Sequence, residues 1–386
     1  LRERFGITRV ADTTYLDRTM LPTYAAVVPN SPDLLSVYSG KGTSPEAAML
    51  SAVMEAVERQ AGAAPRLPIH NQTLAAICDA LQISEGALLP HVAGAQVQCV
   101  SGFDVHTGDP LSVPIAMVQC PWSGQRFMHG GVSTNGLASG NTLVEAVYHA
   151  LCEVIERHVW SMFHTRSTLV PKFYGGPEAA DVPLAPELNL PAENAVVDAL
   201  VQRVRAAGLE LRIFWLQEGE FPYVFVATVS DRFDGLPMTH VGMGCSLSPE
   251  HAVTRAVTEA IQSRVVDIQG AREDILRAHE NHPFYTAHSR RRTAPPTRRW
   301  YFDLSADCVA FAELWDRSNE DLGQDVRTIL NGVRSMNMGR MAVVDLTPDN
   351  CPISVVRVIA PGLETTAVDG MIGARAAALF NPFALC

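Results

Sequence analysis

The amino-acid sequence predicts a mixed α/β (α+β) protein in which three related strand–loop–helix units pack around one centre. Two observations predict this class. Strand-like and helix-like patterns alternate along the 386 residues, and three of the helical patterns resemble one another at intervals near 100 residues. We therefore expect a single domain over residues 1–386, built of subunits at about 1–130, 131–240 and 241–386.

The individual elements follow from residue periodicity. Segments rich in Val and Ile with flanking turn residues predict strands at 22–39, 97–120, 211–216, 222–229, 341–346 and 353–360. Helical periodicity is clearest at 45–61, 142–161 and 249–268, and shorter helices are expected at 193–207, 308–319 and 324–333.

Composition excludes several classes of protein. The net charge of −11 argues against general nucleic-acid binding, which needs clustered Lys and Arg. No apolar run reaches the length of about 18 residues expected of a membrane span. The eight cysteines form no CxxC pair, which argues against a disulfide framework and a zinc site. We expect a cytoplasmic protein with neither nucleic-acid nor membrane partners.

An internal repeat carries most of the information. Residues 42–59, 140–157 and 246–263 align with offsets of 98 and 204. Each segment has Ala at one position, Ala again four residues later, Glu three residues further on, and Glu or Gln three beyond that. The aligned pairs are Glu55/Glu58, Glu153/Glu156 and Glu259/Gln262, the last with one acidic residue. Three such matches predict three topologically related units.

Helical geometry gathers the polar residues of each repeat into a narrow stripe. The stripes are Ser51/Glu55/Glu58, Glu145/His149/Glu153/Glu156 and Arg255/Glu259/Gln262. The other helical positions are mostly apolar, so the acidic stripes are expected to be at least half buried. Stacked carboxylates repel one another and are costly to bury, unless a hard divalent cation offsets the charge. For one helix alone, solvent-facing glutamates would be the simpler interpretation, but three homologous stripes favour a site that holds Mg²⁺ and nucleotide phosphates.

Small residues precede each of these helices. Residues 39–44 include Lys41, and similar segments occur at 133–141 and 242–246. Such loops at a helix N-terminus can present backbone N–H groups to phosphate. None of them matches GxxxxGK[ST], so a P-loop NTPase is excluded.

These motifs together resemble those of the YcaO family, ATP-using enzymes that modify peptide backbone amides. The first motif is Ser-x3-Glu-x2-Glu-Arg, here Ser51 to Arg59. The second is Asn-x3-Glu-x7-Glu-x2-Glu-Arg, here Asn141 to Arg157. The third is Glu-Ala-x-Gln-Ser-Arg, here Glu259 to Arg264, followed by Gly-Ala-Arg-Glu with Arg272. The resemblance implies a YcaO-like fold with one ATP site.

The resemblance also implies roles for individual residues. The expected Mg²⁺ ligands are Glu55, Glu58, Glu153 and Glu156. Nucleotide contacts are expected from Lys41, Ser51, Glu55, Asn141, Glu145, Arg157, Glu259, Gln262, Arg264 and Arg272. Three of these residues are also expected to act in catalysis, by stabilising negative charge on phosphoryl oxygens: Arg157, Lys41 and Arg272.

The subgroup is indicated by residues 6–12, 16–18 (Leu-Asp-Arg) and 356–364, which resemble members that act beside a TfuA-type partner protein. Those members are associated with thioamide formation on ribosomal peptides. Azoline-forming members commonly end in alternating prolines, whereas this sequence has Pro382 alone in its last six residues. The resemblance therefore favours an ATP- and Mg²⁺-dependent thioamidation of a peptide or protein substrate, with a sulfide donor, and it suggests a homodimer.

Three alternatives stay open at this point. The first is an azoline-forming cyclodehydratase that acts on Cys, Ser or Thr of a ribosomal peptide. The second, from another class, is a non-catalytic peptide-binding scaffold, which would predict decay of acidic motifs that are intact here. The third is an unrelated ATP-dependent ligase that forms an acyl phosphate, which explains the threefold repeat less well.

Overall fold

The computed structural model describes residues 1–83, 94–124, 133–173, 185–219, 222–233, 236–272, 307–337, 339–370 and 372–380. The chain forms two compact units. The first contains Leu1–Val57, Leu184–Gln217 and Tyr223–Ser318, and the second contains Glu58–Pro183, Glu218–Pro222 and Asn319–Cys386. The C-terminal residues that bear on the choice between azoline and thioamide, 381–386, lie outside the described residues.

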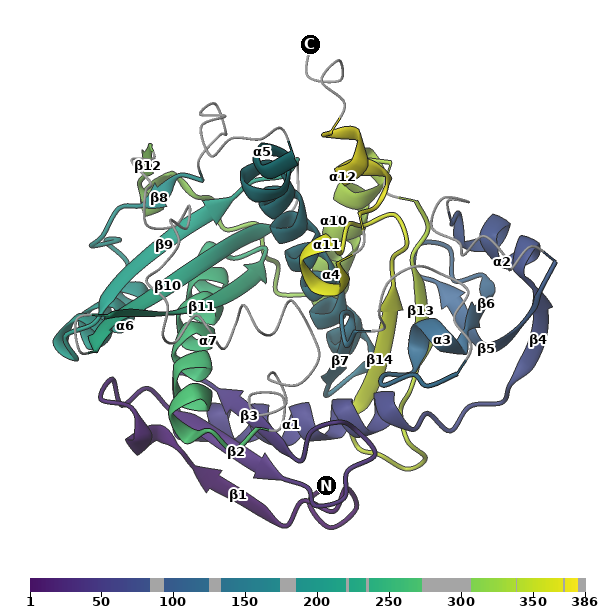
Figure 1. The fold of residues 1–386 in the computed structure, drawn as a ribbon, viewed down its shortest axis with the longest axis horizontal. Coiled ribbons are helices and arrows are strands. Elements are labelled where there is room, and N and C mark those ends of the chain that lie inside the picture. Colours follow the sequence, from purple (N-terminus) through teal and green to yellow (C-terminus); the bar gives the residue numbers. More distant parts are fainter. Residues whose placement is uncertain are drawn as a thin grey trace. The chain divides into compact units, whose positions relative to one another are not determined.

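The first unit contains two sheets (Figure 1). One is an antiparallel sheet of β1 (Arg9–Asp12), β2 (Thr23–Val27) and β3 (Val37–Lys41), with a 3₁₀ turn at Thr14–Leu16. The other has the order β11-β10-β9-β8-β12, with bounds Leu236–Ser246, Tyr223–Phe233, Glu210–Leu216, Glu187–Leu188 and Cys308–Val309.

Two helices of the first unit pack with this second sheet: α6 (Ala195–Ala206) contacts β9, and α7 (Pro249–Gln269) contacts β10 and β11. Their apolar faces and the sheet form one core that includes Val197, Val204, Phe225, Val257 and Ile261. Pro249 starts α7 at a position where its missing N–H is not needed, and Gly270 ends the helix with φ of 61°.

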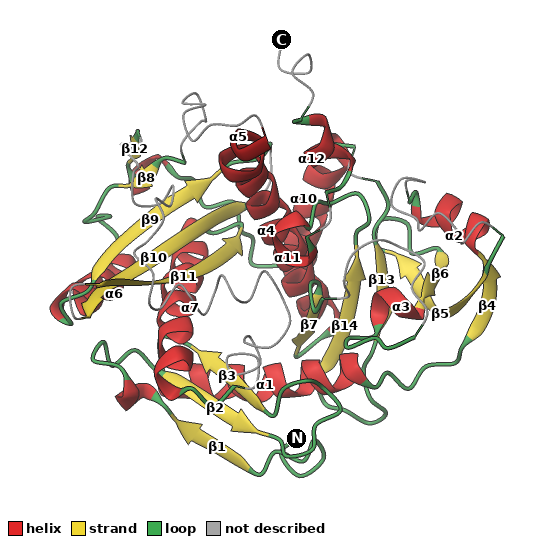
Figure 2. Ribbon diagram, viewed as in Figure 1, coloured by secondary structure: helices red, strands yellow, loops and turns green. Residues whose placement is uncertain are grey.

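The second unit is built on a sheet of order β4-β5-β13-β14-β7, with β6 paired to β5 (Figure 2). The strands are β4 (His70–Thr73), β5 (Gln96–Asp104), β6 (Pro110–Pro114), β7 (Leu137–Gly140), β13 (Ala342–Asp345) and β14 (Ser354–Ile359). Helix α4 (Leu143–His164) packs on β7 and β14, and α10 (Leu322–Ser335) packs on α4.

Shorter helices complete the second unit. They are α2 (Leu74–Leu81), α3 (Ile115–Val118), α5 (Val170–Phe173), α11 (Thr366–Asp369) and α12 (Ala374–Ala378), with a π-helical segment at Thr165–Leu169 between α4 and α5. Helix α1 (Pro45–Ala63) contributes residues to both units. None of the helices in the described part of the chain has the length and apolar character required to cross a bilayer.

The predicted repeat corresponds to strand–helix pairs that share one packing arrangement. A Cβ atom added to Gly40 of β3 would lie 2.2 Å from the Ala48 carbonyl and 2.1 Å from the Ala52 amide of α1. At Gly244 of β11 the same addition would lie 2.1 Å from the carbonyl of Ala252 in α7. Gly40 and Gly244 occupy aligned positions of the repeat. In both cases the strand glycine packs directly against the two alanines of the recurring Ala-x3-Ala pattern on the helix.

The second repeat uses the next aligned glycine in the same way. A Cβ atom at Gly140 of β7 would lie 2.5 Å from the Ala146 amide of α4, and one at Gly42 would lie 2.7 Å from the Ala48 amide of α1. The glycines were predicted to belong to phosphate-cradling loops, and this is wrong for most of them: Gly40, Gly140, Gly242 and Gly244 lie within strands. Their lack of a side chain serves close helix–strand packing.

Most predicted elements are confirmed. The three long helices of the repeat are present, as are α6, α10 and the strands at 210–216, 223–233, 342–345 and 354–359. The helix expected at 308–319 is wrong, because that segment forms the short strand β12 and a 3₁₀ turn at Phe311–Glu313. The expected strand at 97–120 is divided into β5, β6 and α3. The division into three sequence-based subunits stays a prediction.

Candidate functional site

In the first unit, Glu259 and Gln262 of the third repeat join α7 to β3. Lys41 Nζ, at the end of β3, donates to Glu259 Oε2. The other oxygen of Glu259 accepts from the Met243 amide at 3.3 Å, and Gln262 Nε2 donates to the Ser39 carbonyl at 2.5 Å. The structure thus brings together three of the predicted nucleotide-contacting residues, Lys41, Glu259 and Gln262, at one helix–strand contact.

The ion pair between Lys41 and Glu259 reduces the net positive charge at the end of β3. The two side chains are 17% and 23% exposed, so solvent screens the pair only partly. The carboxylate of Glu259 therefore compensates the positive charge of Lys41 within this unit. Ser51 and Glu55 of α1, also assigned to the first unit, are half-buried one turn apart on the helix.

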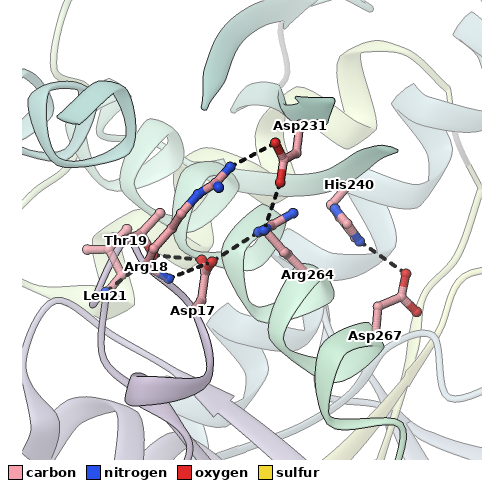
Figure 3. Close-up of polar contacts among 8 residues, drawn as sticks. All are labelled: Asp17, Arg18, Thr19, Leu21, Asp231, His240, Arg264 and Asp267. Carbon is pink, nitrogen blue, oxygen red and sulfur yellow. Dashed lines mark hydrogen bonds and ion pairs between the residues drawn. The ribbon is translucent and has the colours of Figure 1, made fainter. Parts of the chain in front are cut away.

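Arg264, another predicted nucleotide contact, lies in a buried ion-pair network (Figure 3). Its Nε donates to Asp17 Oδ1 at 3.0 Å and its Nη2 donates to Asp231 Oδ2 at 3.1 Å. Arg18 Nη2 lies 2.7 Å from the other oxygen of Asp231. The network joins the segment after the first 3₁₀ turn to α7 and β10 within the first unit, and a role of Arg264 in binding nucleotide stays a prediction.

Two further features lie near the C-terminal end of α7. His240 Nε2 lies 3.0 Å from Asp267 Oδ2, one turn beyond Arg264 (Figure 3). Arg272, a predicted catalytic residue, follows the end of α7 by three residues and is half-buried. Its role in binding nucleotide stays a prediction.

In the second unit, the Glu58 carboxylate of α1 is held by Ser139 of β7. Glu58 Oε1 accepts from the Ser139 amide at 2.9 Å and from its hydroxyl at 2.5 Å. The Ser139 carbonyl in turn lies 3.1 Å from Nδ1 of His149, on the acidic stripe of α4. One predicted metal ligand is therefore oriented by a serine that the sequence did not single out.

Asn141 and Glu145 are brought together at the start of α4. The Glu145 carboxylate accepts from the Asn141 amide at 3.0 Å and from its side-chain Nδ2 at 3.0 and 3.2 Å. Thr142 caps the helix by accepting from the Glu145 amide at 3.2 Å. Asn141 is exposed and Glu145 half-exposed, so both predicted nucleotide contacts are accessible at the positive end of the helix dipole.

The remaining acidic pair lies further along α4. Glu156 is only 3% exposed, Glu153 is half-buried, and Arg157 Nη2 lies 3.5 Å from Glu156 Oε1. A carboxylate this deeply buried needs compensating positive charge, and a single arginine at this distance supplies part of it. The arrangement matches the half-buried stripe that the sequence predicts.

The candidate Mg²⁺ ligands fit a hard cation by their chemistry, since carboxylate oxygens are the ligands that Mg²⁺ prefers. Glu58 has one oxygen engaged by Ser139, and Glu156 is buried beside Arg157. Across the residues that the structure describes, however, no three His, Cys, Asp or Glu side chains form a ready metal-binding group. The four-glutamate set Glu55, Glu58, Glu153 and Glu156 therefore stays a prediction.

Sequence reasoning missed several polar residues that make buried contacts within one or the other unit. They are Ser139, Asp17, Asp231, His158, Arg357 and Glu364. Two signals could have found some of them: Asp17 lies in the Leu16–Arg18 segment that resembles TfuA-associated members, and Arg357 interrupts an apolar strand. The serine and histidine contacts depend on tertiary packing and leave no local pattern.

The pKa of His158 is set by its packing in α4, which the spacing of residues in the sequence does not reveal. Its side chain is completely buried in α4, and its Nδ1 accepts from the Glu364 amide at 2.8 Å. Burial lowers the pKa of His158 to about 4, Glu218 opposes this, and Arg375 and Arg166 add to the lowering. The imidazole is therefore neutral at physiological pH, with Nδ1 unprotonated.

Comparison with known proteins gives a consistent result. The model of the YcaO cyclodehydratase family, described as ATP- and Mg²⁺-binding, matches residues 39–364. An uncharacterized protein of Methanothermobacter thermautotrophicus is 33% identical over 374 residues, which cover 94% of this chain and 91% of the relative. A Rhizobium leguminosarum bv. trifolii protein, described as uncharacterized and in the tfuA 3′ region, is 32% identical over 389 residues, 93% of this chain and 84% of the relative.

Solved structures share the fold. The structure of YcaO from Methanopyrus kandleri bound with AMPPCP and Mg²⁺ gives a TM-score of 0.70 at 24% identity, over 96% of this chain and 90% of that chain. A heterocyclase in complex with substrate and cofactor gives a TM-score of 0.72 at 19% identity, over 93% of this chain and 50% of that chain. The chain thus spans half the length of that heterocyclase.

Proposed function

Because this chain belongs to the YcaO family, whose ligands are ATP and Mg²⁺, we propose that it uses ATP to activate a peptide backbone amide. Resonance makes the amide carbonyl a poor electrophile and its oxygen a poor leaving group. In the proposed reaction a nucleophile adds to the carbonyl carbon, the amide oxygen takes the γ-phosphoryl group of ATP, and that oxygen departs as phosphate. The nucleophile supplies both electrons of its new bond to the carbonyl carbon, so the reaction needs no oxidant or reductant.

One observation carries this proposal: the acidic residues of all three repeats occur on helices that pack in the same way on glycine-bearing strands. Repetition of both the packing and the carboxylates is expected if the units serve one charged ligand. It is not expected of solvent-facing glutamates, and Glu156 is buried.

The chain's own residues would divide the work as follows. Glu55, Glu58, Glu153 and Glu156 would bind Mg²⁺, which neutralises phosphate charge when bound. Arg157, Lys41 and Arg272 would stabilise negative charge on phosphoryl oxygens. Asn141 and Glu145 at the start of α4, with Ser51, Glu259, Gln262 and Arg264, would contact or orient the nucleotide.

We further propose that the nucleophile is sulfide and the product a thioamide. The support is the resemblance of residues 6–12, 16–18 and 356–364 to TfuA-associated members, together with the Rhizobium relative that is described as lying in the tfuA 3′ region. A TfuA-type partner, a homodimeric assembly and a cytoplasmic location belong to the same proposal. The alternative product is an azoline, favoured by the heterocyclases that share the fold.

The experiment that separates these products is mass spectrometry of a candidate peptide incubated with the full chain, ATP, Mg²⁺ and sulfide. Thioamidation replaces one oxygen with sulfur, so the peptide gains the mass difference between these atoms. Azoline formation instead removes one water. Parallel reactions with and without the TfuA-type partner show whether it is required. A peptide of unchanged mass in all reactions, with no ATP consumed, would contradict the catalytic proposal.

A further inference from the structure

Helix α7 is contacted by the N-terminal part of the chain on two of its sides. On one side, β3 contacts the two residues of α7 that are proposed to meet the nucleotide, Glu259 and Gln262. Arg264 lies two residues beyond Gln262, which places it about 200° around the helix axis. Arg264 therefore makes its contacts on the opposite side of α7 from Gln262, and the proposed function leaves its partners without a role.

The contacts on this opposite side form a closed ring of four charged residues (Figure 3). Arg264 Nε donates to Asp17 Oδ1 at 3.0 Å, and its Nη2 donates to Asp231 Oδ2 at 3.1 Å. The ring is closed by Arg18, which follows Asp17 in the chain and whose Nη2 lies 2.7 Å from Asp231 Oδ1. Two carboxylates and two guanidinium groups thus balance in charge while they join the segment after the 3₁₀ turn, β10 and α7.

The centre of this ring is shielded from solvent. The side chains of Asp17 and Arg264 are 2% and 10% exposed, and that of Asp231 is 14% exposed. The Asp17 carboxylate also accepts from the Arg18 amide at 2.9 Å and from the Thr19 hydroxyl at 2.8 Å, which fixes its orientation. Breaking either ion pair of Arg264 would leave a buried charge uncompensated, so the ring strongly favours one position of α7 relative to β10.

Arg264 is better suited to fix the position of α7 than to bind phosphate. It already pairs with two carboxylates, whose negative charge opposes the approach of a phosphate group. A second contact acts near it: His240 Nε2 of β11 lies 3.0 Å from Asp267 Oδ2, one turn further along α7 (Figure 3). This end of the helix is therefore joined to both neighbouring strands, β10 and β11.

We propose that Asp17 and Asp231 are positioning residues of the nucleotide site, which act through Arg264 to set the orientation of α7. The inference deepens the proposed function and rests on it, because it requires that Glu259 and Gln262 contact the nucleotide. Both residues lie within two turns of Arg264 on the same helix. Over so short a distance a helix moves as a rigid element, so a change at Arg264 shifts both residues relative to β3.

The test measures the affinity of the full chain for AMPPCP with Mg²⁺ by calorimetry, at a temperature where circular dichroism shows each variant to be folded. Asp17→Asn and Asp231→Asn keep the size of the side chain and remove one charge of the ring. Each should weaken AMPPCP binding about 10-fold, a typical coupling between two separate sites. A purely structural role would lower stability but leave the affinity of the folded protein unchanged, and this result would overturn the proposal.

Arg264→Lys separates positioning from direct contact with phosphate. Lysine keeps the positive charge but lacks the planar group that bridges two carboxylates, so binding should weaken as much as in Asp17→Asn. Wild-type affinity in Arg264→Lys would overturn the proposal, because it would show that charge alone is needed. The matched control is Glu187→Gln, which removes the partner of Arg212 from an ion pair of the same unit whose side chains are 25% and 19% exposed. It should change the affinity by less than about twofold.

Hydrogen exchange of the wild-type chain keeps the test decisive if the variants of the ring fail to fold. Coupling between two sites is reciprocal, so a nucleotide that depends on the position of α7 must also stabilise the ring. AMPPCP with Mg²⁺ should therefore slow amide exchange at residues 17–21 and 264–269. Unchanged exchange in both segments of a chain that binds AMPPCP would overturn the proposal.

Failure of this inference differs from failure of the proposed function. If the wild-type chain binds AMPPCP and consumes ATP, and the Asp17→Asn and Asp231→Asn variants bind with equal affinity, only the inference is wrong. If the wild-type chain binds no AMPPCP in the presence of Mg²⁺, the proposed function is wrong and the inference fails with it.

Discussion

The Glu58 carboxylate of α1 accepts two hydrogen bonds from one residue, the Ser139 amide and the Ser139 hydroxyl of β7. The first and second repeats of the sequence are thereby joined through a proposed metal ligand. In the first unit, Glu259 and Gln262 of the third repeat are joined in a similar way to β3 of the first repeat. Within each unit, polar residues of one repeat therefore make hydrogen bonds or ion pairs with a strand of another repeat.

The Glu58–Ser139 contact should contribute measurably to stability. Ser139→Ala removes the hydroxyl donor at 2.5 Å and should lower the free energy of unfolding by about 1–2 kcal/mol, because the bond is made to a charged acceptor. Urea denaturation measures the change. Ser335→Ala, which removes an exposed hydroxyl on α10, should change stability by less than about 0.5 kcal/mol. Equal effects of the two variants would show that the Ser139 hydroxyl does not support Glu58.

The strand glycines of the repeat should tolerate no side chain. Gly40→Ala and Gly244→Ala each place a methyl group 2.1 Å from a backbone atom of α1 or α7, so one element must move. We expect a loss of about 3 kcal/mol or more in each variant, at the upper end for overpacking. Thermal or urea unfolding checks this.

Gly323→Ala is the control for these glycines, because its nearest neighbour would be the flexible Asp321 side chain at 3.1 Å. It should change stability by less than about 1 kcal/mol. If Gly40→Ala and Gly244→Ala are as stable as this control, the repeat is not built on direct strand–helix contact.

His158 should make stability depend on pH. Above its unfolded pKa of 6.5, the imidazole is neutral in both the folded and unfolded states. As pH falls below 6.5 the unfolded chain takes up a proton, while the folded chain does so only near pH 4, so stability falls across this interval by up to about 3 kcal/mol.

The comparison variant for this prediction is His158→Asn, whose side-chain oxygen can still accept from the Glu364 amide. Urea denaturation between pH 4 and pH 7 should show a shallower loss of stability in the variant, since carboxylates common to both proteins account for the remainder. Identical slopes would mean that the folded-state pKa of His158 is close to its ordinary value.

Much of this architecture can be predicted from the sequence because it depends on periodicity. The helices of the repeat and most long strands are set by local alternation of apolar and polar residues. The helix expected at 308–319 failed because tertiary pairing with β8 overrides a weak local preference. The glycine-rich segments show a different limit: glycine is required both for turns and for close packing, and only the structure separates Gly40 and Gly244 from loop glycines.

The candidate site is divided in the same way. The family resemblance implies nucleotide contacts from Lys41, Glu259 and Gln262, which the structure brings together in the first unit. It implies the same for Asn141 and Glu145, which are brought together in the second unit. Ser139 and the network around Arg264 depend on contacts between residues far apart in sequence. Metal binding by the carboxylates depends on Mg²⁺ itself, and contacts within the protein do not test it.

The central claim, that buried carboxylates of the repeats bind Mg²⁺ for ATP use, is tested most directly by ATP consumption of Glu156→Gln. The variant keeps the shape of a side chain that is 3% exposed while removing its charge. With Mg²⁺ and peptide present, we expect ATP consumption to fall about 100-fold or more, because the variant loses several kcal/mol of charge stabilisation. The free energy of unfolding should be unchanged or higher, because a buried charge has been removed. Glu46→Gln, an exposed change on α1, should keep full activity. A folded Glu156→Gln protein that consumes ATP and modifies peptide at the wild-type rate would contradict the claim.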